Sequence, residues 1–259
     1  MPGNQLQPNE GQATADQIYR YQQTVGSINY VAVGTRPDIA HPVAKLAEFL
    51  FNPSEKHQKV ANQIIEYLYP TRYQAIEFNG NSSSDDFDLQ ISSDAAFADD
   101  QVTRKSSQGS IIVLFNGPIS WTASKQATVT TSSTEAELLA FTHTAKEVIA
   151  TQRLFQQLDL RLDIKPTIQC DNLQTIRLIN SSLPRIKTAL RHIDIHNSWI
   201  RQAYQEGTFD ISYVPTAANL ADGLTKALPG QKFGQFVKQL GLIDIFSIIE
   251  RDEKSDIEG

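Results

Sequence analysis

The stretch Ser132-Ser133-Thr134-Glu135-Ala136-Glu137 stands at the start of a long helical pattern, which is expected to run from 134 to 158. Behind it, apolar side chains recur at helical spacing and predict one buried stripe. Two overlapping capping boxes fit the hexapeptide, one pairing Ser132 with Glu135 and the other pairing Thr134 with Glu137. In the second register Glu137 is a capping residue, whereas in the first it is free one turn into the helix. The residues alone leave both registers open.

Strand patterns flank this helix on both sides, and further helical patterns separate the later strands. The turn Asn116-Gly117-Pro118 joins two of the early strands and indicates an antiparallel meander. The expected strands are 89–93, 109–115, 119–123, 167–170 and 209–214, and the other expected helices of this part are 172–180, 186–206, 219–228 and 232–240. This order predicts an α/β fold with a mixed sheet flanked by helices. Periodicity alone does not separate it from other α/β layers.

Four acidic residues, Asp94, Glu137, Asp171 and Asp222, stand at the ends of expected strands or near the starts of expected helices. Each has an ordinary explanation by itself. Asp94 suits a strand-end turn, Asp171 suits a helix N-cap, and Asp222 suits an exposed position on a helix. Paired Mg²⁺ ions need a cluster of hard carboxylate oxygens to cut a phosphodiester bond. Taken together, the four residues therefore point to a metal-dependent nuclease.

Composition limits the class of protein. The 259 residues suffice for one large or two modest domains, and 40% hydrophobic and 20% charged residues are typical of globular proteins. The single cysteine, Cys170, excludes an internal disulfide framework and fits a reducing compartment. The net charge of −6 is unusual for a nucleic-acid-binding protein. Binding to nucleic acid would therefore have to depend on local basic patches or on metal ions.

The chain is expected to fall into five segments. Residues 1–17 are polar and predict a disordered tail, and they are neither a secretory signal nor a transit peptide. A helical segment over 18–79 is followed by a linker at 80–88, which is rich in Asn, Ser and Asp. The mixed sheet with its helices occupies 89–245, and 246–259 is an acidic tail. No apolar run approaches the ~20 residues of a transmembrane helix, so we expect no membrane contact.

Several motifs in unbroken order carry a resemblance to a known family. They include the hexapeptide at 132–137 and, in addition, Gly117-Pro118-Ile119-Ser120-Trp121, Cys170-Asp171-Asn172, Tyr213-Val214-Pro215-Thr216 and Leu220-Ala221-Asp222-Gly223-Leu224-Thr225-Lys226. These resemble the ribonuclease H region of Ty1/copia-type retrotransposon Pol polyproteins. Residues 21–52 resemble the helical end of the reverse transcriptase that precedes it. The resemblance covers about residues 18–245.

The resemblance implies a ribonuclease H-like sheet of three antiparallel and then two parallel strands, preceded by a small helical segment like a reverse-transcriptase thumb or connection. The family's four metal-binding carboxylates map onto Asp94, Glu137, Asp171 and Asp222 and would hold two Mg²⁺ ions, with Mn²⁺ as an alternative. The implied reaction is endonucleolytic hydrolysis of the RNA strand of an RNA–DNA hybrid. The implied partner is the rest of a Pol polyprotein, and the implied location is intracellular, in the cytoplasm or in virus-like particles. The polymerase's paired aspartates are missing, so DNA synthesis is not expected.

Six basic residues are candidates for contacts with the hybrid's backbone: Arg104, Lys105, Lys125, Arg185, Lys187 and Arg191. A solvated surface explains each of these clusters about as well.

Two other hypotheses compete with the nuclease. The first is a catalytically silent remnant or a co-opted nucleic-acid or protein interaction module. The acidic net charge and the exchange of basic for neutral residues relative to the family favour it. The second is an unrelated α/β protein with scattered carboxylates. It predicts that Asp94, Asp171 and Asp222 lie more than roughly 10 Å apart, a separation that a two-metal site does not span.

Overall fold

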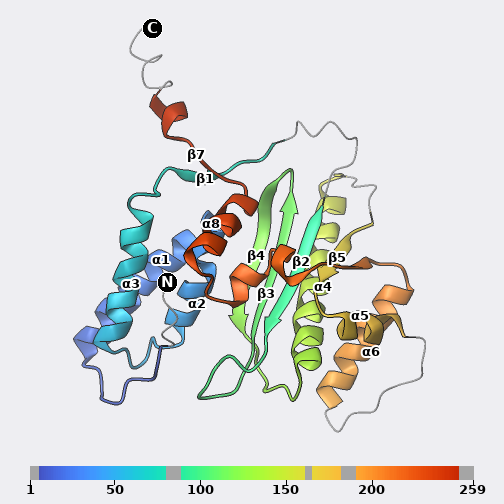
Figure 1. The fold of residues 1–259 in the computed structure, drawn as a ribbon, viewed down its shortest axis with the longest axis horizontal. Helices are drawn as coiled ribbons and strands as arrows, with labels where there is room; N and C mark the ends of the chain where they lie inside the picture. Colours follow the sequence, from blue (N-terminus) through green and yellow to red (C-terminus); the bar gives the residue numbers. More distant parts are fainter. Residues whose placement is uncertain (1–5, 80–88, 161–164, 182–190, 251–259) are drawn as a thin grey trace. The chain divides into compact units, whose positions relative to one another are not determined.

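The computed structural model describes residues 6–79, 89–160, 165–181 and 191–250. The chain divides into two compact units (Figure 1). The first unit comprises residues 1–77 together with 227–259, and the second comprises residues 78–226. The expected linker at 80–88 lies outside the described residues.

The first unit is mainly helical, with α1 (Ala15–Gly34), a 3₁₀ turn η1 (Pro37–Ile39), α2 (Ala40–Ala47) and α3 (Glu55–Leu68). Thr14 and Ser54 cap α1 and α3, since each hydroxyl accepts the backbone N–H three residues on. Proline at the first position of η1 fits the fixed backbone angle that a helix start requires. The core between the helices consists of Tyr21, Val25, Ile28, Ala32, Ile39, Val43, Leu46, Ala61 and Ile64.

The expectation of a disordered tail over 1–17 is corrected by the contacts of its later residues. Helix α1 begins at Ala15, inside the expected tail, because Thr14 and Gln17 form a capping box. The Asn52 side chain accepts the Ala13 N–H at 2.9 Å and donates to the Gly11 carbonyl at 3.0 Å. These bonds attach the segment before α1 to the loop before α3. Residues 1–5 lie outside the described residues.

A small sheet joins the two ends of the first unit. Strand β1 (Gln74–Ile76) pairs antiparallel with β7 (Leu242–Asp244), which follows α8 (Gly230–Gln239). Phe233 of α8 packs edge-on against Tyr67 of α3. The expected range of 89–245 for the sheet domain therefore extends past the second unit, because its last helix packs with the N-terminal helices. Three-residue strands give too short a pattern to be recognised in the sequence.

The second unit is built on a five-stranded sheet in the order β4–β3–β2–β5–β6. Strands β2 (Gln90–Ala96), β3 (Ser107–Leu114) and β4 (Gly117–Lys125) are antiparallel. Strands β5 (Thr167–Cys170) and β6 (Asp210–Tyr213) continue from β2 in parallel. This arrangement confirms the predicted ribonuclease H-like sheet of three antiparallel and then two parallel strands.

Helices cover both faces of this sheet. The long α4 (Ser133–Gln157) packs on β2 and β3, where Ala95 meets Ala136 and Ala140. Residues alternate between the faces of a strand, so Asp94 points to the opposite face, toward the single-turn α7 (Asp222–Thr225). The remaining helices are α5 (Leu173–Asn180), α6 (Arg191–Gln205) and the 3₁₀ turn η2 (Thr216–Ala218) (Figure 1). The helix expected over 219–228 is thus only one turn long.

A buried ion pair ties the helices of the first unit to the segment that follows α3. Arg36 is 3% exposed, and its guanidinium donates to both carboxylate oxygens of Asp38 at 2.9 and 2.7 Å. Arg36 also donates to the Thr71 carbonyl at 2.9 Å, and the Tyr67 hydroxyl donates to Asp38 at 2.7 Å. Loss of one partner would leave the other charge buried without compensation.

We expect Asp38→Ala to lower the free energy of unfolding of the first unit by about 3–5 kcal/mol, because Arg36 would stay buried without its carboxylate. Asp16→Ala is the control, since Asp16 pairs with Arg20 on the surface, where the side chains are 65% and 74% exposed. Its unfolding midpoint in urea should match that of the wild type. Equal midpoints for both variants would show that the buried pair does not stabilise this unit.

Candidate metal centre

Three aspartates lie close together at the carboxyl ends of the neighbouring strands β2 and β5 of the five-stranded sheet. Asp94 lies in β2 and Asp171 directly follows β5, and because these strands are parallel neighbours, their carboxyl ends lie together. Asp222 begins α7, which packs on β2 and β3. One carboxylate oxygen from each aspartate lies within 4.8 Å of the other two. This proximity contradicts the hypothesis of an unrelated protein with scattered carboxylates.

The start of α4 resolves the two capping registers. The Ser132 hydroxyl accepts the Glu135 N–H at 3.2 Å, and the Glu135 carboxylate accepts the Thr131 hydroxyl at 2.8 Å. The first register is therefore the one that forms, and Glu137 is not used as a cap. A Glu137 carboxylate oxygen instead lies within 4.8 Å of an Asp171 oxygen. The structure thus brings together all four predicted carboxylates around Asp171.

Asp171 is also released from the capping role that its position suggested. The next residue, Asn172, caps α5 instead, and its side-chain oxygen accepts the N–H groups of Gln174 and Thr175, each at 3.0 Å. The Asp171 carboxylate therefore remains available to face Asp94 and Asp222.

Buried oxygens in the cluster fit a bound cation. Asp94 is 1% exposed and Glu137 is 6% exposed. Within the described residues, Asp94 Oδ1 and Glu137 Oε2 are buried and have no hydrogen-bond partner. A buried carboxylate oxygen without a donor is costly, and a metal ion supplies the missing partner. Carboxylate oxygens are hard ligands, which suit Mg²⁺ or Mn²⁺.

Burial raises the pKa of two carboxyl groups in the cluster, those of Asp94 and Glu137. Burial raises the pKa of Asp94 to about 6, although the Lys226 ammonium and the Thr225 hydroxyl oppose the rise. Burial also raises the pKa of Glu137 to about 9, and the negative charges of Asp94 and Asp171 raise it further. A cation in the cluster would reverse this effect by favouring the charged form of each group.

Two residues that the sequence reasoning did not single out bring α7 onto the sheet. Gly109 pairs with Asp94 across β3 and β2, and a Cβ atom there would lie 2.8 Å from Leu224 Cβ and 3.1 Å from the Ala221 carbonyl oxygen. The Asn219 side chain donates to the Ser93 carbonyl at 3.0 Å. A glycine inside a strand is a known sign of close backbone approach, so Gly109 offered a usable signal.

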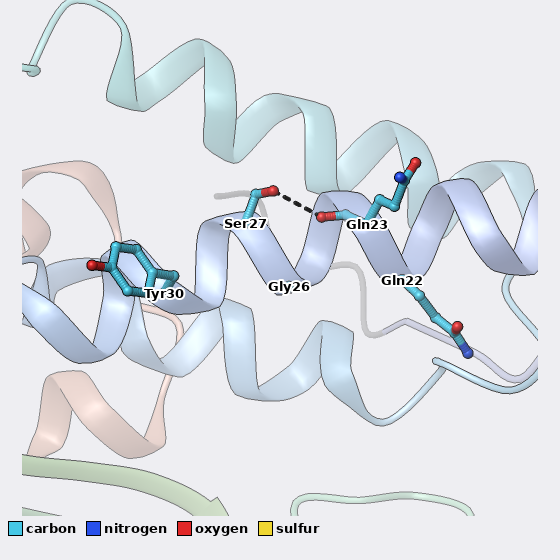
Figure 2. Close-up of a pocket in the computed structure, with 5 residues that line it drawn as sticks. All are labelled: Gln22, Gln23, Gly26, Ser27 and Tyr30. Atoms are coloured by element: carbon cyan, nitrogen blue, oxygen red, sulfur yellow. Dashed lines mark hydrogen bonds between the residues drawn. The ribbon is translucent and has the colours of Figure 1, made fainter.

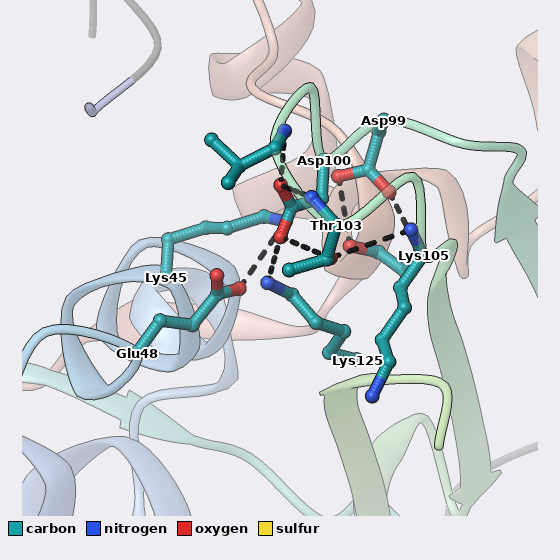
Figure 3. A network of polar contacts seen from close by, with 9 residues as sticks. Lys45, Glu48, Asp99, Asp100, Thr103, Lys105 and Lys125 are labelled. Atoms are coloured by element: carbon teal, nitrogen blue, oxygen red, sulfur yellow. Dashed lines mark hydrogen bonds and ion pairs between the residues drawn. The ribbon is translucent and has the colours of Figure 1, made fainter. Parts of the chain in front are cut away.

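Three of the predicted basic residues, Arg104, Lys105 and Lys125, are described by the structure, and none of their ammonium or guanidinium groups pairs with a carboxylate of the cluster. Arg104 and Lys105 lie on the connection between β2 and β3, where Arg104 is exposed and Lys105 is half-buried. Lys125 forms an ion pair with Asp100, which also accepts the Thr103 hydroxyl at 2.8 Å (Figure 3). Arg185 and Lys187 lie outside the described residues, and the side chain of Arg191 is not described. The cation that does reach the cluster is Lys226, to which the sequence assigned no role.

One depression of the described surface lies along α1, is widely open to solvent, and is lined by Gln22, Gln23, Gly26, Ser27 and Tyr30 (Figure 2). Its lining holds no carboxylate, imidazole or thiol, and the Ser27 hydroxyl donates to the Gln23 carbonyl of the same helix at 2.9 Å. This surface therefore offers no carboxylate, imidazole or thiol to bind a metal ion, and Tyr30 is its one titratable side chain. Separately, none of the helices in the described ranges has the length and apolar character that a membrane crossing requires.

In sequence, the chain is similar to Pol polyproteins of plant retrotransposons. No family model matches the chain. The retrovirus-related Pol polyprotein from transposon TNT 1-94 of Nicotiana tabacum is 37% identical over 213 residues, which are 82% of this chain and 16% of that protein. The Pol polyprotein from transposon RE1 of Arabidopsis thaliana is 36% identical over 86% of this chain and 15% of its own length. The chain thus spans a small part of these relatives. Among solved structures, LC11-RNase H1 in complex with an RNA/DNA hybrid covers 53% of this chain and 93% of its own, with 15% identity and a TM-score of 0.38.

The raised pKa of Glu137 predicts a pH-dependent stability in the absence of metal. Its pKa rises on folding from 4.5 to about 9, so the proton-bound form stabilises the folded state at low pH, and this contribution is lost as the pH rises through that window. Glu137→Gln removes the titration and keeps the shape. In EDTA its melting temperature should exceed that of the wild type at about pH 8, and the difference should shrink at about pH 5. Glu147→Gln on the same helix is the control, and a pH-independent difference for Glu137→Gln would contradict the raised pKa.

The close packing at Gly109 makes a second prediction. In Gly109→Ala the new methyl group forces α7 away from β3, which should lower the free energy of unfolding by about 1–3 kcal/mol and weaken Mg²⁺ binding as Asp222 moves. Gly26→Ala is the control, because that glycine lies in α1 with no neighbouring atom within 4 Å of the added carbon. Its stability should stay level or rise. Urea unfolding and titration calorimetry with Mg²⁺ measure both quantities, and an unchanged Gly109→Ala would show that α7 tolerates the displacement.

Proposed function

Because this chain belongs to the Pol polyproteins of Ty1/copia-type retrotransposons, we propose that its second unit is a ribonuclease H that hydrolyses the RNA strand of RNA–DNA hybrids with divalent metal ions. The observation that carries the proposal is the meeting of Asp94, Asp171 and Asp222 oxygens within 4.8 Å of one another, with Glu137 beside Asp171. The sheet order supports the proposal, since the neighbouring strands β2 and β5 bring Asp94 and Asp171 together at their carboxyl ends. The similarity of this chain to retrotransposon Pol polyproteins supports the proposal.

In this proposal the four carboxylates would bind the metal ions in two groups that share Asp171. Asp171 contributes to both groups of neighbouring oxygens, one with Asp94 and Asp222 and the other with Glu137, so it is placed to serve both ions. The four carboxylates would hold two Mg²⁺ ions, or Mn²⁺ in their place, and the bound ions would supply activation of the attacking water and stabilisation of the leaving 3′ oxygen. The Thr225 hydroxyl donates to Asp94 Oδ2 and fixes the orientation of that carboxylate, while Oδ1 stays without a protein donor.

The grip on the substrate would come from the surface around this edge. Arg104 and Lys105 lie on the connection at the carboxyl end of β2, the end that carries Asp94, and would contact phosphates of the hybrid. Arg185, Lys187 and Arg191 are proposed for the same role. The helical first unit would be the end of a reverse transcriptase, and the rest of a Pol polyprotein would supply further contacts with the hybrid. Such a reaction would take place inside the cell, in the cytoplasm or in virus-like particles.

A second candidate function is a catalytically silent remnant or an interaction module. The net charge of −6 and the engagement of Lys125 with Asp100 favour it, because both reduce the attraction for a polyanion. This candidate predicts a folded protein without hybrid cleavage.

Cleavage of a labelled RNA–DNA hybrid by the purified full chain in Mg²⁺ separates these two functions. We expect Asp94→Asn to reduce the cleavage rate by at least about 100-fold, since removal of a residue behind a ligand already costs roughly 10–100-fold in metal affinity or activity. Asp210→Asn, a surface aspartate of the same unit that pairs with Lys165, should cleave at the wild-type rate. Equal rates for wild type and Asp94→Asn, or no cleavage by either, would refute the enzyme and leave the silent module.

A further inference from the structure

One ammonium group already occupies the mouth of the carboxylate cluster. Lys226 directly follows α7, four residues after Asp222, and its Nζ lies 2.7 Å from Asp222 Oδ1 and 3.5 Å from Asp94 Oδ2. The Lys226 side chain is 40% exposed, whereas that of Asp94 is 1% exposed. The lysine therefore reaches from solvent into the cluster and pairs with two of the carboxylates proposed as metal ligands.

The backbone of α7 fixes this placement. The Lys226 N–H donates to the Asp222 carbonyl at 3.1 Å, which closes the single turn of α7. The preceding residue, Thr225, donates its hydroxyl to the same Asp94 oxygen that Lys226 approaches. Both donors thus act on Asp94 Oδ2, and within the described residues Oδ1 has no hydrogen-bond partner. The lysine offsets the charge of the cluster without supplying a hydrogen bond to Asp94 Oδ1.

The Lys226 ammonium and a divalent ion would compete for the same carboxylates, because two cations at short range repel each other. Aspartates this close repel one another when they are ionised, and a neighbouring positive charge reduces that repulsion. A metal ion would do so more strongly, but it would also face the charge of Lys226 at short range. The Lys226 side chain is 40% exposed, so its flexible stem can move the ammonium into water when a stronger cation takes its place beside the carboxylates.

We propose that Lys226 is a built-in counter-ion that holds Asp94 and Asp222 together in the metal-free protein and is displaced when a divalent cation binds. The proposal rests on the proposed function, because it takes Asp94 and Asp222 as metal ligands. Lys226 is a positioning residue in this scheme, acting through the carboxylates. Lys226 lowers the affinity of the site for divalent cations, and it stabilises the carboxylate cluster in the metal-free protein.

The test is titration calorimetry of the full chain with MgCl₂, without nucleic acid, together with thermal melting in EDTA and in saturating Mg²⁺. In Lys226→Met the Mg²⁺ affinity should rise by at least about fivefold, because a competing unit charge is gone. The melting temperature of this variant should fall below that of the wild type in EDTA and match it in saturating Mg²⁺. Lys226→Arg keeps the charge and should restore the wild-type values in both measurements. Lys226→Gln, which can still donate to Asp222, should show the same tightening and serves if the Met variant does not fold.

Lys165→Met is the matched control. Lys165 pairs with Asp210 in the same unit and its side chain is 41% exposed, close to the exposure of Lys226, but it lies outside the carboxylate cluster. Its Mg²⁺ affinity should equal that of the wild type. If the wild type binds Mg²⁺ while Lys226→Met or Lys226→Gln binds it with equal or lower affinity, the counter-ion role is refuted alone. If the wild type binds neither Mg²⁺ nor Mn²⁺, the proposed function fails with it.

Discussion

The second unit has to hold several carboxylates close together in a buried place, and this repulsion is the constraint on which its other features depend. Oxygens of Asp94, Asp171 and Asp222 lie within 4.8 Å of one another, and Asp94 is almost completely buried. Such an arrangement opposes folding unless protons, cations or donors offset it. The structure supplies each of these: a raised pKa at Asp94, the Lys226 ammonium and the Thr225 hydroxyl. The framework must also be rigid enough to resist separation of the charges.

That rigidity comes from backbone contacts more than from the acidic residues themselves. Parallel pairing of β2 with β5 fixes Asp94 beside Asp171, and the absence of a side chain at Gly109 lets α7 pack directly on β3. Asn219 then ties the segment before α7 to the backbone of β2. At the start of α4, Glu135 is the glutamate that contacts the capping segment, through the Thr131 hydroxyl, so Glu137 is not needed as a capping residue. Glu137 and Asp171 are therefore free to face the cluster, because Glu135 and Asn172 perform the capping tasks beside them.

Much of this could be predicted from the sequence, because the strands and the long helix carry strong periodic patterns. The strand Thr167–Cys170 was placed at its observed bounds, and the four carboxylates were identified as one set. The choice between the capping registers of α4 could not be made, since it depends on contacts of Thr131 and Glu135 in three dimensions. The pairing of β1 with β7 was missed, because three-residue strands far apart in sequence leave no local pattern. The role of Lys226 could not be predicted, because its partner Asp94 is 132 positions away in the chain and becomes a neighbour only on folding.

The acidic net charge and a polyanionic substrate are compatible once charges are counted locally. The total of −6 includes carboxylates spread over both units, and salt screens charges beyond roughly 8–10 Å at physiological ionic strength. Asp100 is already neutralised by Lys125, and the cluster itself would gain the charge of two divalent ions when filled. The edge of the sheet would then be less negative than the sequence suggests, with Arg104 exposed on the nearby connection. Under the proposed function, metal binding would precede substrate binding, because the carboxylates alone would repel the phosphates that the same carboxylates with bound cations would attract.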